Sequence, residues 1–249
     1  MIYHLTIILP TLNERENIIR QIEALYRAAP GIAEIIVVDD NSNDGTREAV
    51  QASYSDLIAK GKIKLIHRTK DLGLTNSLKE AVMQSTQPFV GWMDCDLSMP
   101  PELLPKLMEE IMKGADIALG SRFKKGGNQK SLIDVGQDSR AEIILSTLLN
   151  GALRLVTGAP CTDFTSGFIV VKKSWLENFN WRGSHGEYFI YLISDAHREG
   201  KKIAELPYSC GSRQYGESKT FGNWRAVVRN SLRYSGTMLN VLRAKVIRF

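Results

Sequence analysis

The sequence predicts an α/β fold built on a mostly parallel sheet flanked by helices. Apolar runs of strand length alternate with helical segments of about 10 to 15 residues, and no internal repeat interrupts this order. Such alternation favours right-handed strand–helix–strand crossovers, which place successive strands parallel to one another. The chain has 249 residues, 43% of them hydrophobic, and is long enough to bury a sizeable core.

The predicted elements follow one another from the amino terminus. His4–Leu9 predicts the first strand, which stops at Pro10. Asn13 and Glu16 predict a capping box that opens a helix reaching about Ala29. The other strands are expected at Glu34–Val38, Lys62–His67, Phe89–Met93 and Asp116–Gly120. The other helices are expected at Thr46–Ala59, Thr75–Ser85, Pro101–Lys113, Arg140–Val156 and Phe221–Ile247.

Two aspartates directly follow the strand predicted at Phe89–Met93. Asp94 and Asp96 stand one residue apart, and Pro100-Pro101-Glu102 then predicts the start of a helix. Because residues two apart in an extended chain point the same way, both carboxylates are expected to project from the strand end into one site. Taken alone, so short a pattern also fits ordinary loop acids, one of which caps the helix.

The turns that follow the first two strands indicate which ligand the sheet binds. A dinucleotide site requires glycines at the first turn, where this chain has Pro10-Thr11-Leu12-Asn13-Glu14. The second turn offers Asp39 and Asp40, which suit the hydroxyls and base edge of a nucleoside. We therefore expect no nicotinamide or flavin. Phosphates would instead be bound through Mg²⁺ or Mn²⁺ held by the oxygen ligands of Asp94 and Asp96.

Positive charge gathers at the carboxyl end of the chain. From Arg213 onward, eight basic residues stand against one acid, a balance of +7 that leaves about −2 of the total +5 for the rest. This distribution predicts an anionic partner, which is a phosphate-bearing substrate, an acidic membrane surface or nucleic acid. No recognised nucleic-acid-binding motif accompanies the basic tail, so we expect no nucleic acid partner.

Two predicted helices are amphipathic. The apolar positions are Ile144, Leu145, Leu148, Ala152 and Leu155 in the first, and Trp224, Val228, Leu232, Ser235, Leu239 and Leu242 in the second. The second also carries a cationic stripe of Arg225, Arg229 and Arg233. A basic amphipathic helix is typical of an anionic membrane surface, although packing on the sheet with the charges in water is the other interpretation. No stretch approaches the roughly 18 apolar residues of a membrane span.

Cysteine usage and the amino terminus bear on the compartment. Cys95, Cys161 and Cys210 are well separated and form no CxxC pair, which predicts free thiols in a reducing compartment. The amino terminus lacks a basic region followed by a long apolar run, so no signal peptide is indicated. Together with the basic amphipathic tail, these features predict a cytoplasmic protein peripherally associated with the inner face of a membrane.

Five segments in register carry a family resemblance. They are Ile8-Leu9-Pro10-Thr11-Leu12-Asn13-Glu14, Val37-Val38-Asp39-Asp40-Asn41-Ser42, Asp94-Cys95-Asp96, Gly120-Ser121-Arg122-Phe123 and Arg213-Gln214-Tyr215-Gly216-Glu217-Ser218-Lys219. In this order they resemble family 2 glycosyltransferases of the GT-A fold. The last segment and Asp163–Phe168 are similar to the dolichyl-phosphate or polyprenyl-phosphate mannose synthase branch. The resemblance implies a catalytic domain over residues 1–220, followed by a basic amphipathic segment over residues 221–249.

The resemblance implies roles for individual positions. Nucleoside contacts fall on Pro10, Glu14, Val38 and Asp40, the metal and diphosphate site on Asp94, Cys95 and Asp96, and phosphate contacts on Arg122, Arg213 and Lys219. Leu12 stands where the family often has a tyrosine that could stack on the base, so the base stays open. Cys95 replaces the usual alanine, which exchanges one small residue for another. We expect Asp96 to be the direct metal ligand and Asp94 to lie nearer the sugar nucleotide.

The implied reaction is an inverting, metal-dependent transfer of a hexose from a nucleotide sugar, with GDP-mannose favoured over a UDP-hexose, to a polyprenyl phosphate. An acceptor phosphate is largely ionised at neutral pH and needs a cationic clamp, for which we expect Arg140 beside Arg122. The loops Lys124–Asp138 and Ser209–Lys219 are expected to close over substrate. Two alternatives stay open: a family 2 transferase acting on a sugar hydroxyl of a glycan, and a nucleotide-sugar-binding module without turnover.

Overall fold

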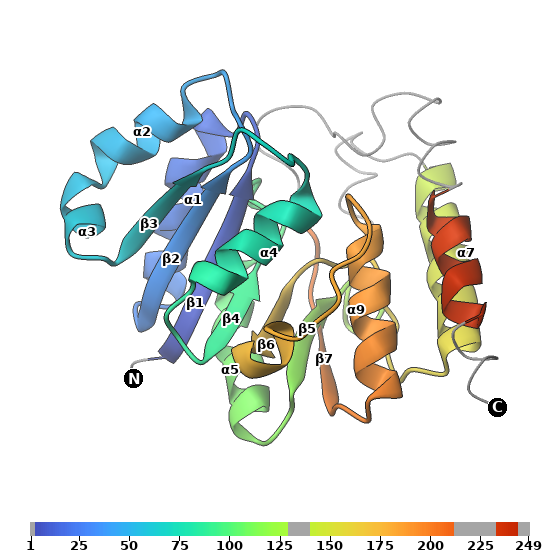
Figure 1. Cartoon of the computed structure of the whole chain (residues 1–249). Coiled ribbons are helices and arrows are strands. Elements are labelled where there is room, and N and C mark those ends of the chain that lie inside the picture. Colours follow the sequence, from blue (N-terminus) through green and yellow to red (C-terminus); the bar gives the residue numbers. More distant parts are fainter. Residues whose placement is uncertain (1–2, 129–139, 212–232, 244–249) are drawn as a thin grey trace.

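The computed structural model describes residues 3–128, 140–211 and 233–243, and it is organised around one seven-stranded sheet (Figure 1). Its strands are β1 (Tyr3–Thr11), β2 (Ile32–Asp39), β3 (Ile63–His67), β4 (Phe89–Trp92), β5 (Ile117–Ser121), β6 (Ile169–Lys172) and β7 (Ile203–Pro207). Their order in the sheet is β3-β2-β1-β4-β6-β5-β7. Only β6 runs against the other strands of this sheet, since it is antiparallel to both β4 and β5. The predicted α/β fold with a mostly parallel sheet is confirmed.

Helices pack on both faces of this sheet (Figure 1). They are α1 (Arg15–Ala28), α2 (Thr46–Ser53), α3 (Ser55–Ala59), α4 (Leu74–Gln84), the 3₁₀ helix η1 (Pro101–Leu103), α5 (Leu104–Met112), α7 (Arg140–Thr157), α8 (Lys173–Leu176) and α9 (Glu187–Arg198). A further helix covers residues 233–243.

Each strand predicted from the sequence corresponds to an observed strand, with bounds that differ by a few residues.

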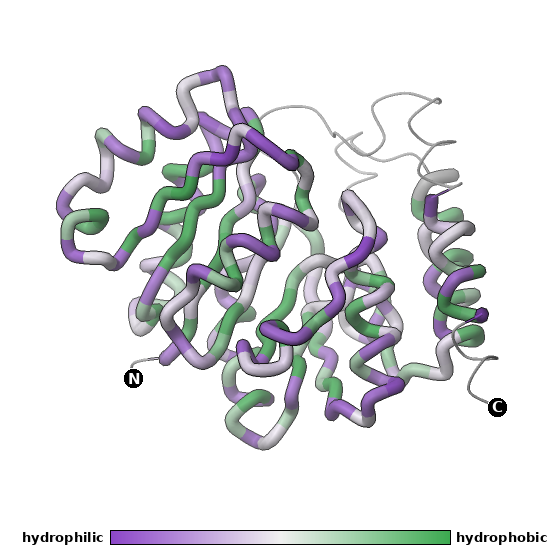
Figure 2. Tube along the Cα trace, viewed as in Figure 1, coloured by the Kyte–Doolittle hydropathy of each residue, from purple (hydrophilic) through white to green (hydrophobic). Residues whose placement is uncertain are grey.

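The alternation of side chains along the strands divides the core into two layers. Ile8 of β1 and Ile36 of β2 belong to the layer that contains α4 and α9. Ile7 and Ile35, one residue earlier in each strand, belong to the layer that contains α1 and α5. Figure 2 shows the central strands as mostly hydrophobic. Burial on both faces explains why these strands read as unbroken apolar runs rather than as alternating patterns.

The antiparallel strand β6 enters the sheet between β4 and β5, and the sequence analysis did not predict it. Gly91 of β4 pairs with Val170 of β6. A Cβ atom at Gly91 would lie 2.7 Å from the carbonyl oxygen of Ile169, closer than a Cβ atom approaches an oxygen to which it is not bonded. Glycine at this position therefore allows β4 and β6 to pair.

The capping box predicted at Asn13 is wrong. Helix α1 begins at Arg15 with Glu14 as its N-cap, and no side-chain cap bond forms. Asn13 instead has a positive φ of 54°. Its backbone N–H donates to Ser42 Oγ at 2.8 Å, and its Oδ1 accepts from Asn43 N at 3.0 Å. Asn13 thus joins the loops that follow β1 and β2 at the same edge of the sheet.

The helix predicted over Thr46–Ala59 is interrupted at Tyr54. Backbone angles of φ −130° and ψ 26° at Tyr54 separate α2 from α3. The Tyr54 hydroxyl donates to the carbonyl oxygen of Ile19 in α1 at 3.2 Å. The interruption therefore accompanies a tertiary contact that propensity alone does not encode.

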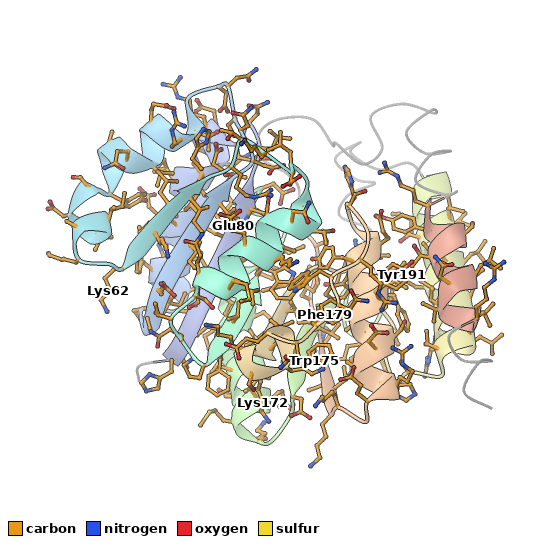
Figure 3. The ribbon with its side chains drawn as sticks, viewed as in Figure 1. Lys62, Glu80, Lys172, Trp175, Phe179 and Tyr191 are labelled. Atoms are coloured by element: carbon orange, nitrogen blue, oxygen red, sulfur yellow. The ribbon has the colours of Figure 1, made fainter. Side chains whose placement is uncertain are left out.

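The helix over residues 233–243 packs against α9. Asn240 Nδ2 donates to the hydroxyl of Tyr191 on α9 at 3.1 Å, and Thr237 and Val241 are buried. Figure 3 shows Tyr191 on the side of α9 that faces this helix. Helix α7 also contacts α9. Within the described ranges, no helix is both long and apolar enough to cross a membrane.

Candidate active site

The carboxyl ends of four strands meet at one edge of the sheet. Strand β1 ends at Thr11, β2 at Asp39, β4 at Trp92 and β5 at Ser121. Ligands of open α/β sheets bind outside this edge. The loops that leave these four strands therefore form the candidate active site.

The two aspartates lie in the loop after β4 and not on the strand, because β4 ends at Trp92. Asp94 is exposed, whereas Asp96 is 5% exposed and its Oδ1 accepts a hydrogen bond from Ser98 N at 3.0 Å. Leu97 then has a positive φ of 64°, which is uncommon for a non-glycine residue and concentrates at functional loops. The prediction that both carboxylates project alike from an extended strand is therefore wrong.

Cys95 connects this aspartate loop to the end of β1. Its thiol donates a weak hydrogen bond to the carbonyl oxygen of Pro10, with a distance of 3.4 Å from sulfur to oxygen. The side chain of Cys95 is 3% exposed. Cys95 therefore holds the aspartate loop against Pro10, one of the residues expected at the nucleoside.

The other residues expected near the nucleoside lie in or after the first two strands, and they differ in exposure. Leu12 is 39% exposed on the turn after β1. Glu14 follows it, and its Oε2 accepts a hydrogen bond from Asn17 Nδ2 at 2.8 Å. Val38 is fully buried in the core layer that contains α4 and α9. The side chain of Val38 thus supports the sheet, and its backbone pairs with Pro10 of β1 and Ile66 of β3.

Asp40 is engaged by the loop between β3 and α4. Its Oδ1 accepts hydrogen bonds from Arg68 Nη1 at 2.6 Å and Ser77 Oγ at 3.0 Å. Its Oδ2 accepts from Gly73 N at 2.7 Å. Asp40 therefore holds this loop in place beside the second strand. The sequence analysis predicted a direct nucleoside contact for Asp40 and did not predict this structural role.

Arg68 is the partner that the sequence analysis missed. Its side chain is 5% exposed, and besides Asp40 it donates to Glu80 Oε2 at 2.9 Å. It also donates to the carbonyl oxygens of Lys70 at 3.3 Å and Asp71 at 2.7 Å. A cation placed directly after β3, at the same edge as the acids after β2, is the signal that could have revealed it.

Arg122, at the end of β5, is fixed by Asp163. Its Nε donates to Asp163 Oδ2 at 2.8 Å and its Nη2 to Asp163 Oδ1 at 2.9 Å, with a third bond from Nη2 to Thr165 Oγ1 at 2.9 Å. Burial lowers the pKa of Arg122, but the Asp163 carboxylate outweighs burial and raises it. Nη1 has no hydrogen-bond partner within the described ranges, so this end of the guanidinium can bind an anion.

Glu205 of β7 organises the loop that carries Asp163. Its Oε1 accepts hydrogen bonds from Thr162 N at 2.8 Å, Thr162 Oγ1 at 2.8 Å and Asp163 N at 3.1 Å. Burial and the Glu205 carboxylate raise the pKa of the Cys161 thiol well above its ordinary value, so Cys161 stays protonated. The sequence carries no local sign of this role, because Glu205 lies more than 40 residues beyond its partners.

The segment after β7 returns to the aspartate loop. Asn128 N donates to Tyr208 O at 3.1 Å, and Cys210 N donates to Asn128 O at 2.9 Å. Gly211 N then donates to Ser98 O at 2.8 Å. These bonds bring the chain that leads into Arg213 against the loop of Asp94 and Asp96.

Three of the predicted cations have no described side chain. Arg213 and Lys219 lie outside the described residues, and Arg140 begins α7 but its side chain is outside them too. Their contacts with phosphates stay predictions, as does closure of the loops Lys124–Asp138 and Ser209–Lys219.

The aspartate loop has the donor set of a hard divalent cation. Asp94 and Asp96 offer carboxylate oxygens, which Mg²⁺ and Mn²⁺ prefer. Among the described residues, no group of three or more histidine, cysteine, aspartate or glutamate side chains forms a metal site. The two aspartates therefore fit a cation that takes its remaining ligands from water and from substrate phosphates, as Mg²⁺ commonly does.

Comparison with solved structures supports the fold. Glucosyl-3-phosphoglycerate synthase from Mycobacterium tuberculosis, crystallised with Mn²⁺, UDP and glucosyl-3-phosphoglycerate, superposes with a TM-score of 0.69 at 18% identity, covering 96% of this chain and 79% of that one. The same enzyme crystallised with Mg²⁺ and UDP gives a TM-score of 0.68 at 18% identity, over 96% and 79% of the two chains. At this identity the likeness shows a shared GT-A fold.

Relatives matched by sequence share more identical residues with this chain than those solved structures do. Dolichol-phosphate mannosyltransferase of Pyrococcus furiosus is 34% identical over 220 residues, which cover 87% of this chain and 59% of the relative's length. The Saccharomyces cerevisiae protein of the same name is 32% identical over 228 residues, covering 87% and 81%. Polyprenol monophosphomannose synthase of Mycolicibacterium smegmatis is 28% identical over 223 residues, covering 87% and 81%.

The family model described as "Glycosyl transferase family 2" matches residues 6–179. This match begins in β1 and continues beyond β6, so it contains the aspartate loop as well as Arg122 and its partner Asp163. The matched residues thus include most of the sheet edge described above, and the chain belongs to glycosyl transferase family 2.

Proposed function

We propose that this chain transfers a hexose, with inversion, from a nucleoside diphosphate sugar to a polyprenyl phosphate, with GDP-mannose favoured over a UDP-hexose. The observation that carries the proposal is the presence of opposite charges at one sheet edge. The aspartate loop follows β4, and the Arg122 guanidinium, fixed by Asp163, follows β5. The names of the Pyrococcus and Saccharomyces relatives support mannose as the sugar and a lipid phosphate as the acceptor.

The aspartate loop is proposed to hold Mg²⁺ or Mn²⁺. Asp96 would be the direct ligand, and exposed Asp94 would lie nearer the sugar nucleotide. When bound, the cation supplies positive charge to the diphosphate oxygens of the donor. The metal ions in the crystals of glucosyl-3-phosphoglycerate synthase support this proposal.

The proposed transfer is a single displacement. An oxygen of the acceptor phosphate forms a bond to the anomeric carbon of the hexose, and the bond from that carbon to the donor diphosphate breaks. The electron pair stays with the departing nucleoside diphosphate. Arg213 and Lys219 would stabilise that diphosphate, whereas Arg122 and Arg140 would bind the acceptor phosphate. Cations held in place before the reaction stabilise developing charge without reorganising.

Glu187, at the start of α9, helps to distinguish the two acceptor classes. Its Oε1 accepts hydrogen bonds from Ser184 N at 3.1 Å and Ser184 Oγ at 3.3 Å. Burial raises the pKa of Glu187, but backbone and side-chain hydrogen bonds outweigh burial and lower it below its ordinary value. A sugar hydroxyl acceptor needs a general base, and a carboxylate with a lowered pKa is a weak one. A phosphate monoester, with a second pKa of about 6, needs none.

Helix α7 provides a means of reaching a lipid. Ile144 is 59% exposed, Leu148 66% and Leu155 85%, so the apolar stripe predicted from the sequence faces outward. Leu239, on the helix over residues 233–243, is 53% exposed. We propose that these side chains attach the protein peripherally to the cytoplasmic face of a membrane. Residues 1–220 would form the catalytic domain and residues 221–249 a basic segment beside the membrane.

One assay tests the proposed function. Radiolabelled GDP-mannose and UDP-glucose are incubated with polyprenyl phosphate and Mn²⁺, and the product is extracted into organic solvent. We expect label in the organic phase from the wild type and a loss of at least about 100-fold in Asp96→Ala. Label that enters only a water-soluble glycan would favour the glycan transferase. Donor binding without any product would favour the non-catalytic module.

A further inference from the structure

The hydroxyl of Tyr234, on the helix over residues 233–243, reaches the start of α9. A Cβ atom at Gly186, the N-cap of α9, would lie 2.7 Å from this hydroxyl oxygen. The absence of a side chain at Gly186 is therefore what allows the phenol to approach. Within the described ranges the Tyr234 hydroxyl has no hydrogen-bond partner. In contrast, the hydroxyl of Tyr191 on α9 accepts a bond from Asn240.

The start of α9 belongs to the catalytic edge of the sheet. The carbonyl oxygen of Ser184 lies 3.3 Å from the position of a Cβ at Gly73. Gly73 in turn donates its N–H to Asp40 Oδ2 at 2.7 Å. The loop before α9 is thus in contact with the loop that Asp40 holds. The Tyr234 hydroxyl stands beside this contact and not on the outer surface of the C-terminal helix.

Charges of both signs surround the Tyr234 hydroxyl. Arg122 and Arg233 both act on it electrostatically, and Arg233 Nη1 lies 3.4 Å from His185 Nδ1. The opposing acid is Glu187, whose Oε1 is occupied by Ser184. Burial and Glu187 raise the pKa of Tyr234, although the two arginines lower it by smaller amounts. The hydroxyl is therefore protonated at neutral pH and can donate a hydrogen bond.

We propose that the Tyr234 hydroxyl donates a hydrogen bond to the acceptor phosphate, the same group that Arg122 is proposed to bind. This inference rests on the proposed function and adds to it a residue from outside residues 1–220. The C-terminal helix would then have two roles: its exposed Leu239 faces the membrane, and its Tyr234 binds the headgroup of the lipid. Since a hydrogen bond to a charged group is stronger than a neutral one, its loss should be measurable in acceptor affinity.

The direct test measures binding of geranyl phosphate, a short and soluble isoprenyl monophosphate, by isothermal titration calorimetry of the full chain. We expect Tyr234→Phe to raise the Kd by roughly 10-fold to 100-fold. The Kd of the nucleotide sugar and the midpoint of unfolding should not change, because the lost hydroxyl has no hydrogen-bond partner among the described residues. Gly186→Ala, whose φ of −60° suits alanine, should displace the hydroxyl and raise the Kd in the same direction.

Two matched controls separate a binding role from a structural one. Gly236→Ala lies on the same helix, where an added Cβ meets nothing within 4 Å, and should leave the Kd unchanged. Tyr191→Phe removes a hydroxyl that is bonded to Asn240, so it should lower the unfolding midpoint without changing the Kd.

The other possible results distinguish failure of the Tyr234 inference from failure of the proposed function. An unchanged Kd for geranyl phosphate in Tyr234→Phe, or no binding by the wild type, would overturn this inference. A raised Kd for the nucleotide sugar alone would also overturn it, and would assign the hydroxyl to the donor. Normal geranyl phosphate binding without lipid-soluble product from any donor would overturn the proposed function alone.

Discussion

Asp163 holds Arg122 through both carboxylate oxygens, at 2.8 Å from Nε and 2.9 Å from Nη2, although the two residues are 41 positions apart. The side chain of Asp163 is fully buried and that of Arg122 is 18% exposed. This pair joins the loop after β5 to the segment before β6. The guanidinium is therefore oriented before any ligand binds, which would reduce the ordering cost of the proposed phosphate binding.

Asp163→Asn should destabilise the protein by about 3 kcal/mol, because it leaves a largely buried cation without its counter-charge. Urea unfolding measures the change. Glu110→Gln, which breaks an exposed pair with Lys113, is the control and should have no measurable effect. If Asp163→Asn unfolds at the same urea concentration and with the same slope as the wild type, the pair is not what stabilises this edge.

The two aspartates should respond differently to amide substitution. Asp96 is buried and bonded to Ser98 N, whereas Asp94 is exposed. We expect Asp94→Asn to retain metal-dependent binding of GDP-mannose and Asp96→Asn to lose it, with a Kd at least about tenfold higher. Calorimetric titration with and without Mn²⁺ makes the comparison. The opposite result would reverse the two assignments.

The outward stripe of α7 should carry membrane attachment. Leu148→Glu places a charge on the stripe, and Thr147→Glu places the same charge on an exposed neighbouring position. We expect Leu148→Glu to lower co-sedimentation with anionic vesicles by about tenfold, since it removes an apolar side chain from the lipid interface. The Thr147→Glu variant should bind much as the wild type does. Equal losses in both variants would show that charge, and not the apolar stripe, controls binding.

Asp44 should contribute to the pH dependence of stability. Burial raises its pKa, but hydrogen bonds from the Thr46 hydroxyl and from the backbone N–H groups of Arg15 and Thr46 outweigh burial and lower it. A lowered pKa in the folded state stabilises the protein above the unfolded value of about 3.9 and loses this effect as the pH falls through the folded value.

Unfolding measured from pH 6 to pH 2 should therefore show a steeper loss of stability in the wild type than in Asp44→Asn. Thr46→Val removes one donor and should give an intermediate profile. Parallel curves for the wild type and Asp44→Asn would exclude this contribution.

Much of the fold followed from local pattern. The strands from His4 to Gly120 were predicted because each is a short apolar run bounded by polar turns, and their parallel pairing followed from the helices between them. Strand β6 was not predicted, because its place between β4 and β5 depends on contacts across the sheet that leave no local signature. The capping box at Asn13 was wrong for a related reason, since Asn13 bonds the loop after β2 instead.

The candidate site also contains residues that could be proposed from the sequence and residues that could not. Asp94 and Asp96 could be proposed from sequence because they follow a predicted strand, and Arg122 was implied by the family resemblance. The residues that orient the site could not. Arg68 and Glu205 meet Asp40 and Thr162 only after the chain folds. The position of Arg68 directly after a predicted strand was the one available signal, and Glu205 had none within a few residues.

The insertion of β6 has a geometric consequence for the site. Neighbouring strands lie about 4.8 Å apart, so one intervening strand separates the ends of β4 and β5 by roughly 9–10 Å. The aspartate loop leaves one of these ends and Arg122 the other. Strand β6 thus sets the distance between the loop proposed to bind a cation and the arginine proposed to bind an anion. Direct pairing of β4 with β5 would bring the aspartate loop and Arg122 closer together, and under the proposed function it would leave less room for a sugar between donor and acceptor phosphates.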